Sequence, residues 1–464
     1  MNFFKKIKHI HFVGIGGAGM IGIARVLLKK GYKVSGSDLN GSYELTKIKK
    51  DGAKVFIGHS KLNIKGANLI VVSSAIDNKN SEIVEAKKNS ITIIPRAEML
   101  GSIMRGYESI AIAGSHGKTT TTSMIAKIFS AAKLSPTYVV GGKVLSTDEN
   151  SDLGKGNYLI AEADESDGSF SHLHPDVAVL TNIDDDHLVH YDNNFENLLD
   201  SFVMFSENVP FYGYMVINRD DRNIRKIAKR ISRKQITFGK SSKVDFQILE
   251  SNYCDGLQDF ILRDNQRNKT HSFNISQPGI HNVFNAAASI AVCIEEGLPI
   301  KAIKRGIKEF SGVGRRYEKH PLLINKKKKI LIDDYVHHPI EILANIRATK
   351  EEFPDKKVCM IFQPHRFSRT AQLFDDFVDV LKKVDSLILL DIYSASEKPI
   401  KGIDSRTIVE TIKQEGHKDI YYVKNHNDVA DLLENIEKGF DILITQGAGS
   451  VSGVCELIKD TWKT

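Results

Sequence analysis

The sequence predicts an α/β protein with three domains, at residues 1–106, 107–313 and 314–464. Short apolar strands alternate with helical stretches along the chain, a pattern that favours parallel sheets. In each of the first two blocks, a glycine-rich turn joins such a strand to a helix. The chain has 464 residues, more than a single hydrophobic core usually serves, which supports several domains.

In the first block we expect strands at 10–13, 32–36 and 68–73. A glycine turn from Gly14 to Gly19 follows the first strand, and Asp38 lies nineteen residues after Gly19. This spacing matches the dinucleotide fingerprint of a Rossmann-like domain, in which a pyrophosphate binds at the helix N-terminus. Any nucleotide diphosphate would satisfy that requirement, so the pattern alone does not select NAD.

The central block carries a second glycine turn, Gly114 to Thr120, between a strand at 109–113 and a helix from Lys118 onward. Backbone amides of such a turn can hold phosphate oxygens, the lysine can reach the β- and γ-phosphates, and the next hydroxyl can bind Mg²⁺. The loop departs from the usual GxxxxGK[ST] spacing, because its two glycines are only three residues apart. We therefore expect a parallel sheet like that of phosphate-loop ATPases, with an ordinary helix start as the alternative.

Polar segments also follow two other strands of this block. Residues 162–167 place four carboxylates after the strand at 158–161, where an α/β sheet binds ligands, and hard oxygen donors suit Mg²⁺. Residues 182–187 follow the strand at 177–182 and bring His187 to the same edge, for a second metal or a phosphate. A solvated acidic loop and a structural histidine are the alternatives.

Two side chains on one helical face could read a purine. His281 and Asn285 stand at i and i+4, although capping and packing explain the pair almost as well.

The third block contains four buried-looking strands separated by helical stretches, at 329–333, 358–362, 386–390 and 441–445. This again predicts a Rossmann-like, doubly wound sheet. Segments rich in tyrosine, histidine and arginine end two of these strands, at 333–339 and 363–369, and Arg315 and Arg316 lie where the second and third blocks join. Arginine forks bind carboxylates and phosphates, so we expect an anionic ligand, with a surface role as the alternative.

Composition narrows the class of protein. The hydrophobic fraction of 41% and the charged fraction of 26% are those of an ordinary soluble protein. The net charge of +7 is mild, and the densest lysine run, Lys326 to Lys329, reads as a hairpin turn, so we expect no nucleic-acid partner. Four scattered cysteines and no apolar run of ~18 residues predict a cytoplasmic protein without disulfides, zinc or a membrane span.

Taken in order, the segments GSHGKTTTT, EADESD, NIDDDH, GIHNVFNAAA, GVGRRYE, DDYVHHP and QPHRFSRT resemble the Mur ligases, over nearly the whole chain. The match is specific to the branch that joins L-alanine to UDP-N-acetylmuramate. The resemblance implies ATP and Mg²⁺ as cofactors, an acyl-phosphate intermediate, and a monomer or homodimer. It also implies that the first domain holds the UDP group of the substrate, with no nicotinamide.

The resemblance further implies a role for individual residues. Lys118, His187, His337 and Arg366 would be catalytic. The UDP-substrate would contact Gly14, Gly16, Gly17, Gly19, Asp38 and Ser73. ATP would contact Gly114, Ser115, His116, Gly117, Lys118, Thr119 and Thr120, with His281 and Asn285 near the adenine and Arg316 or its neighbour Arg315 on the γ-phosphate. Thr119 and Glu162 would bind one Mg²⁺, with His187 helping a second, and Tyr335, His337, His365, Arg366 and Arg369 would surround the alanine and the reacting carboxylate.

Two further features favour the alanine-adding branch. Several relatives use a carbamylated lysine about fifteen residues beyond the histidine of the third motif, whereas this chain has Phe202 there and no lysine nearby. Pro364-His365-Arg366 favours biosynthesis over a related ligase that recycles cell-wall tripeptides. An NAD-dependent oxidoreductase would leave the Gly-Lys-Thr loop unexplained, and a regulatory nucleotide-binding protein would leave the third-domain cluster unexplained.

Overall fold

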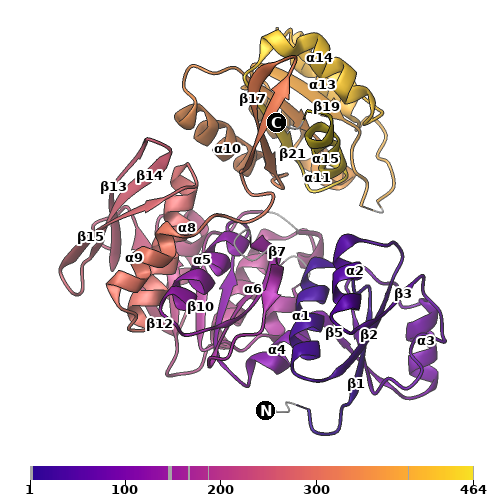
Figure 1. Ribbon diagram of the computed structural model, residues 1–464. Coiled ribbons are helices and arrows are strands. Elements are labelled where there is room, and N and C mark those ends of the chain that lie inside the picture. Colours follow the sequence, from indigo (N-terminus) through magenta and orange to yellow (C-terminus); the bar gives the residue numbers. More distant parts are fainter. Residues whose placement is uncertain (1–3, 145–148, 166–167, 186–187, 396, 463–464) are drawn as a thin grey trace. The chain divides into compact units, whose positions relative to one another are not determined.

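The computed structural model describes residues 4–144, 149–165, 168–185, 188–395 and 397–462 (Figure 1). Contacts divide the chain into two compact units. The first comprises Met1–Asn252, Asp259–Ile275 and Asn282–Ser311, and the second comprises Tyr253–Gln258, Ser276–His281 and Gly312–Thr464. The first unit contains the N-terminal sheet and the central parallel strands, and the second contains the C-terminal sheet.

The N-terminal sheet is parallel throughout, with strand order β3-β2-β1-β4-β5. Its strands are β1 (His9–Val13), β2 (Lys33–Asp38), β3 (Lys54–Ile57), β4 (Leu69–Val72) and β5 (Thr92–Pro95). The accompanying helices are α1 (Ala18–Lys29), α2 (Tyr43–Lys50), α3 (Ser81–Lys88) and α4 (Arg96–Met104). All five residues of β1 are buried, which explains why this strand reads as a continuous apolar run. Because β1 is the middle strand of the five, the glycine turn that follows it leaves the sheet at its centre.

The central sheet has ten strands in the order β15-β14-β13-β12-β11-β10-β6-β9-β7-β8. The pairs from β12 through β7 are parallel, as predicted, but β8 is antiparallel to β7 and makes the sheet mixed. The strands are β6 (Glu108–Ala113), β7 (Thr137–Val144), β8 (Glu149–Asp152), β9 (Tyr158–Glu162), β10 (Val177–Leu180), β11 (Tyr214–Asn218), β12 (Lys234–Gly239), β13 (Phe246–Cys254), β14 (Leu257–Asp264) and β15 (Lys269–Ile275). The longer helices are α5 (Lys118–Ala131), α6 (Phe195–Glu207), α7 (Arg222–Ile227), α8 (Ile280–Glu295) and α9 (Ile300–Lys308).

The C-terminal sheet has the order β16-β17-β21-β18-β19-β20 and is parallel except for β16. The strands are β16 (Glu318–Ile324), β17 (Lys327–Asp334), β18 (Val358–Phe362), β19 (Ser386–Leu390), β20 (Ile420–Val423) and β21 (Ile442–Gln446). The helices are α10 (Pro339–Glu352), α11 (Phe367–Gln372), α12 (Phe374–Leu381), α13 (Ser405–Gln414), α14 (Asp428–Ile436) and α15 (Val451–Thr461). Asn325 and Lys326 turn the β16–β17 hairpin with positive φ angles of 48° and 64°, so the lysine run begins in a turn.

The topology places the predicted motifs at strand ends. In the central sheet, β6 lies between β10 and β9, so the glycine turn and both acidic segments leave from adjacent strands. In the C-terminal sheet, β21 lies between β17 and β18, whose carboxyl ends carry the tyrosine-, histidine- and arginine-rich segments. All four cysteines are free thiols, and no helix among the described residues is long and apolar enough to cross a membrane.

Candidate active site

The phosphate loop joins β6 to α5, and its two glycines have conformations that other residues rarely adopt. Gly114 has a φ of 128° and Gly117 a φ of 81°. A Cβ at Gly114 would lie 2.3 Å from Thr181 Oγ1, and one at Gly117 would lie 2.3 Å from Asn285 Oδ1. Both positions therefore require glycine for backbone conformation and for space.

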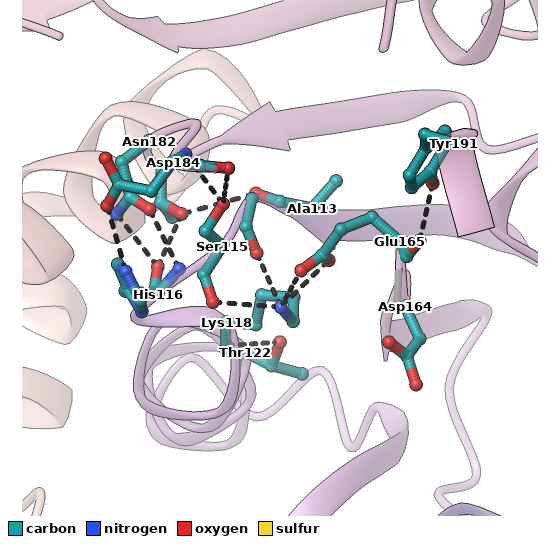
Figure 2. A network of polar contacts seen from close by, with 12 residues as sticks. Ala113, Ser115, His116, Lys118, Thr122, Asp164, Glu165, Asn182, Asp184 and Tyr191 are labelled. Atoms are coloured by element: carbon teal, nitrogen blue, oxygen red, sulfur yellow. Dashed lines mark hydrogen bonds and ion pairs between the residues drawn. The ribbon is translucent and has the colours of Figure 1, made fainter. Parts of the chain in front are cut away.

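Hydrogen bonds from the segment after β10 hold this loop in place (Figure 2). Asn182 accepts the amide of His116 at 2.8 Å through its side-chain oxygen and donates back to the His116 carbonyl at 3.0 Å. The Ser115 hydroxyl accepts the Asp184 amide at 2.8 Å, and the Asp184 carboxylate lies 2.9 Å from the His116 ring. Sequence reasoning singled out this segment for His187 and missed the supporting roles of Asn182 and Asp184.

The Lys118 side chain folds back over the loop that precedes it (Figure 2). Its ammonium donates to the carbonyl oxygens of Gly114 at 2.5 Å and Ser115 at 3.2 Å. It also pairs with the two carboxylate oxygens of Glu165 at 2.9 and 2.8 Å. Although burial alone would lower the pKa of Lys118, the charges of Glu165 and Asp164 raise it. Lys118 is therefore a charged group at the loop where phosphates are expected.

Glu165 is the partner that sequence reasoning did not single out within the acidic segment. It is 2% exposed, and this burial raises its pKa to about 7 even though Lys118 is close. Its carbonyl oxygen accepts the Tyr191 hydroxyl at 2.5 Å, which fixes the backbone at this point (Figure 2). A carboxyl with this pKa changes charge near neutral pH, directly against the lysine of the phosphate loop.

The predicted Mg²⁺ ligands Thr119 and Glu162 lie at the ends of adjacent elements. Thr119 is in the first turn of α5, and Glu162 ends β9, where one carboxylate oxygen accepts the Gly141 amide at 2.7 Å. The Glu162 charge acts on Lys118 together with those of Asp164 and Glu165. These hard oxygen donors fit Mg²⁺, which usually binds through one or two carboxylates plus substrate phosphates.

No group of three or more acidic, histidine or cysteine side chains that could hold a metal occurs among the described residues. His187 and Asp167 lie outside the described residues, so the second-metal assignment stays a prediction.

The two residues expected near the adenine, His281 and Asn285, both lie on α8. Asn285 packs against the phosphate loop, with its Oδ1 3.4 Å from the Thr121 hydroxyl that donates to it. His281 belongs to the second unit, where burial lowers its pKa to about 4 and Glu341 and Arg316 exert opposing charge effects. A neutral imidazole at pH 7 suits recognition of an uncharged base.

The N-terminal glycine turn is also shaped by its neighbours. The Asp38 carboxylate accepts the Gly16 amide at 2.8 Å, so this residue holds the turn itself. Gly14 has a φ of 81°, and a Cβ there would lie 3.2 Å from that of Ser73. Gly17 N donates to Gly14 O at 3.3 Å, which closes the turn.

Arg96 connects this turn to the acidic segment of the central sheet. A Cβ at Gly19 would lie 2.8 Å from one guanidinium nitrogen of Arg96, and another guanidinium nitrogen lies 3.2 Å from Asp164 Oδ2. Arg96 was missed because a single arginine at the start of α4 carries no motif of its own. Its position gives the N-terminal glycine turn and the carboxylate segment a shared cationic neighbour.

In the second unit, the structure separates the roles of two adjacent arginines. The Arg315 guanidinium is held by Asp333 at 3.0 Å and by the Gly447 carbonyl at 2.8 Å. The Arg316 guanidinium lies 4.0 Å from the Glu341 carboxylate, and, like that of Arg315, it lies 5.4 Å from the centre of the Tyr335 ring. Arg315 is therefore committed to the fold, whereas Arg316 is the better candidate for a phosphate.

The Asp334 carboxylate holds the backbone just after Arg316 and just after Tyr335. Its two carboxylate oxygens accept the amides of Tyr317 at 2.7 Å and Val336 at 2.8 Å. Burial raises the pKa of Asp334 to about 6, and the Arg316 charge opposes this rise. The loop that presents Tyr335 is thus anchored by a buried carboxyl at the end of β17.

Four aromatic side chains, from the segments that follow β17, β18 and β19, form a row of ring contacts. Tyr335 meets His337 with 5.7 Å between ring centres, and His337 meets His365 at 5.5 Å. His365 stacks on Tyr393 at 5.4 Å, and the backbones of these two residues are bridged. Sequence reasoning predicted the first three members but not Tyr393, which follows β19 without a recognisable motif.

Arg366 and Arg369 stand at the start of α11, beside this row. Arg369 is buried, with Nη1 3.4 Å from His365 Nδ1. Arg366 has a φ of 72° and donates its amide to Tyr393 at 2.8 Å, while its buried Nε has no partner among the described residues. Glu397 accepts the amide and hydroxyl of Ser368 at 2.9 and 2.7 Å and so holds the first turn of the helix.

Comparison with known proteins covers the chain in three consecutive parts. Residues 9–108 match the Mur ligase family catalytic domain, residues 112–293 the Mur ligase middle domain, and residues 315–449 the Mur ligase glutamate ligase domain.

Among solved structures, a UDP-N-acetylmuramate-alanine ligase from Thermotoga maritima is 27% identical, with a TM-score of 0.83 over 98% of this chain and 99% of that one. A murein peptide ligase from Psychrobacter arcticus is 22% identical, with a TM-score of 0.73 over 98% of both chains. A tripeptide ligase from Neisseria meningitides is 26% identical, with a TM-score of 0.60 over 67% of this chain and 100% of that chain. With all three of its parts matched, the chain belongs to the Mur ligase family.

Proposed function

We propose that this protein joins L-alanine to the carboxylate of UDP-N-acetylmuramate at the expense of ATP. The observation that carries the proposal is the phosphate loop, in which a charged Lys118 stands among the carboxylates of the adjacent strand end. The likeness to the Thermotoga maritima alanine ligase supports this substrate pair. A recycling ligase that adds a tripeptide is the second candidate, because a murein peptide ligase is similar over the same length.

The proposal assigns ATP to the first unit. A carboxylate is a poor electrophile, so one of its oxygens attacks the γ-phosphorus and forms an acyl phosphate, releasing ADP. Lys118 stabilises the charge that spreads over the transferred phosphoryl group, and Arg316 contributes in the same way. Thr119 and Glu162 would hold Mg²⁺, whose charge supplies further electrostatic stabilisation.

The amino acid is assigned to the second unit. Arg366 and Arg369 provide guanidinium groups for its carboxylate, beside the row formed by Tyr335, His337 and His365. The neutral amine attacks the acyl carbon, and the tetrahedral intermediate expels phosphate, which carries away one oxygen of the original carboxylate. A histidine of the row accepts the amine proton.

Oxygen labelling tests this sequence of steps. When the muramyl carboxylate carries ¹⁸O, one labelled oxygen should appear in each released phosphate, as mass spectrometry of the phosphate can measure. Besides ADP, the product should be a nucleotide sugar heavier than UDP-N-acetylmuramate by one alanyl residue. Phosphate without label would contradict the acyl-phosphate route, and a product heavier by a tripeptide would favour the recycling reaction.

A further inference from the structure

Two histidines, His337 and His365, are neighbours in the row of ring contacts described above, with 5.5 Å between their ring centres. A neutral imidazole has one protonated nitrogen, which donates, and one unprotonated nitrogen, which accepts a hydrogen bond or a proton. The partner of one nitrogen therefore decides what the other nitrogen can do. The contacts of the two rings give them opposite roles.

The partner of His337 is a backbone carbonyl. The Nδ1 atom of His337 lies 3.2 Å from the carbonyl oxygen of Tyr335, and because this oxygen can only accept, Nδ1 carries the proton. The carbonyl belongs to the peptide unit whose amide, that of Val336, donates to the Asp334 carboxylate at 2.8 Å, so its direction is fixed. The Tyr335 ring meets the imidazole at 89°. The neutral His337 ring therefore has its lone pair at Nε2.

The partner of His365 is a guanidinium. The Nη1 atom of Arg369 lies 3.4 Å from Nδ1 of His365, and because a guanidinium can only donate, Nδ1 accepts and the proton lies at Nε2. Tyr393 holds the ring from its face, stacked at 5.4 Å with 16° between the planes. Two backbone hydrogen bonds of 2.8 Å, from the Arg366 amide to the Tyr393 carbonyl and from the Tyr393 amide to the Pro364 carbonyl, keep the two rings together. A second proton on His365 would break its contact with Arg369 and place two cations side by side.

The order of the side chains along the row fits the two ends of an amino acid. Arg366 and Arg369, which provide the guanidinium groups for its carboxylate, stand on the His365 side. A hydrogen-bond donor at Nε2 of His365 suits that same carboxylate. His337 lies one ring further, towards Tyr335, and an acceptor at its Nε2 suits the ammonium group.

On the basis of the ligase function proposed above, we infer that His337 is the general base of the reaction, acting through Nε2, and that His365 is a hydrogen-bond donor. Amide formation removes two protons from the alanine ammonium. His337 takes the first, which leaves the nitrogen with the lone pair that forms the C–N bond. The bond between the acyl carbon and the phosphate oxygen then breaks, and the second proton leaves with the phosphate as hydrogen phosphate. His337 returns its proton to water.

The two tautomers can be measured without any substrate. In full-length protein labelled with ¹⁵N-histidine, long-range ¹H–¹⁵N correlation spectra in mildly alkaline buffer distinguish rings protonated at Nδ1 from rings protonated at Nε2. The signals that disappear in His337→Asn and in His365→Asn identify the two rings. We expect the proton at Nδ1 in His337 and at Nε2 in His365. A proton at Nε2 of His337 overturns the inference, whatever reaction the protein catalyses.

Kinetics with two nucleophiles distinguish a base from a residue that only binds alanine. Hydroxylamine is mostly neutral at neutral pH, so it traps an acyl phosphate as a hydroxamate without needing a base. With saturating L-alanine, His337→Asn should lower kcat by about 10²–10⁴-fold. With hydroxylamine in place of alanine, the same variant should form the hydroxamate at a rate within a few-fold of the wild type. His365→Asn should mainly raise the KM for L-alanine, and His426→Asn, between β20 and α14 and outside the row, should change neither reaction.

Full kcat of His337→Asn at saturating alanine would overturn the inference, as would a loss of kcat in His365→Asn in its place; both results leave the ligase function standing. Loss of both reactions in His337→Asn overturns it as well, because the residue then serves acyl-phosphate formation or the fold, which thermal melting by circular dichroism separates. A wild-type protein that forms neither the alanyl product nor the hydroxamate would refute the ligase function itself, and the inference with it.

Discussion

Replacing Arg366 by alanine or by glycine should weaken the use of L-alanine equally, but the two variants should differ in stability. The residue has φ 72° and ψ 136°, a region that glycine occupies easily and other residues occupy at a cost of about 1–3 kcal/mol. Arg366→Ala keeps this strain, whereas Arg366→Gly removes it. Glycine should therefore stabilise the second unit relative to alanine, the reverse of the usual order within helices and strands.

The size of the effect on catalysis follows from the lost guanidinium. Each hydrogen bond to a charged group contributes about 1.5–3 kcal/mol, and the Arg366 guanidinium can make two such bonds with the alanine carboxylate. Losing part of this binding free energy should raise the KM for L-alanine by about tenfold to a thousandfold in both variants. The KM values for ATP and UDP-N-acetylmuramate should stay within a few-fold, because Arg366 lies next to His365 and Tyr393, beside the proposed amino-acid site, and belongs to neither glycine turn.

Steady-state kinetics with each substrate varied in turn, and thermal melting of the same proteins, make up the assay. A strain difference of 1 kcal/mol should separate the melting temperatures of the two variants by about 2–4 °C in a domain of this size. Arg347→Ala, at an exposed position on α10, is the matched control and should change neither quantity. A rise in the KM for ATP with an unchanged KM for alanine would refute the alanine assignment, and equal melting temperatures would refute the strain argument.

Three further predictions concern the first unit. Lys118→Ala should abolish ligation and weaken ATP binding while leaving UDP-N-acetylmuramate affinity nearly intact by calorimetry; equal loss of both affinities would contradict the separation of the two glycine loops. Glu162→Gln should raise the Mg²⁺ concentration needed for half-maximal rate, and an unchanged Mg²⁺ dependence would remove it as a ligand. The pKa of Glu165 is about 7, so above that pH the ionised carboxylate pairs with Lys118 and opposes the binding of phosphates. The affinity for ADP should therefore fall as the pH rises from 6 to 8, and more steeply in the wild type than in Glu165→Gln. Parallel titration curves for the two proteins would argue against this competition.

Much of the fold was predictable because buried parallel strands read as continuous apolar runs. The strand predicted at 358–362 coincides with β18, and that at 386–390 coincides with β19. Two of the strands that were missed lack such a run: β3 has no fully buried residue, and β13 is buried at only two of its nine positions. β11 was missed although all five of its residues are buried. β3 lies at the edge of its sheet and β13 lies inside a larger one, and both are defined by their pairing partners, which a single sequence does not reveal.

The position of the phosphate loop was also predictable, because its glycines and lysine act through the local backbone. The partner of Lys118 was not, since Glu162, Asp164 and Glu165 occupy one short segment and only the path of the chain decides which carboxylate turns toward the loop. The choice between Arg315 and Arg316 required structure for the same reason. Arg315, with a φ of 56°, turns to Asp333 and Gly447, and adjacent residues of one type look alike in a sequence.

Phosphate release from ATP, measured with each acceptor and each amine in turn, tests the central claim most directly. The account predicts that release requires UDP-N-acetylmuramate and L-alanine together, with little release when either is omitted. The tripeptide L-alanyl-γ-D-glutamyl-meso-diaminopimelate should not replace alanine at the same concentration. Release that depends on the tripeptide and ignores L-alanine would contradict the account and make the protein a recycling ligase.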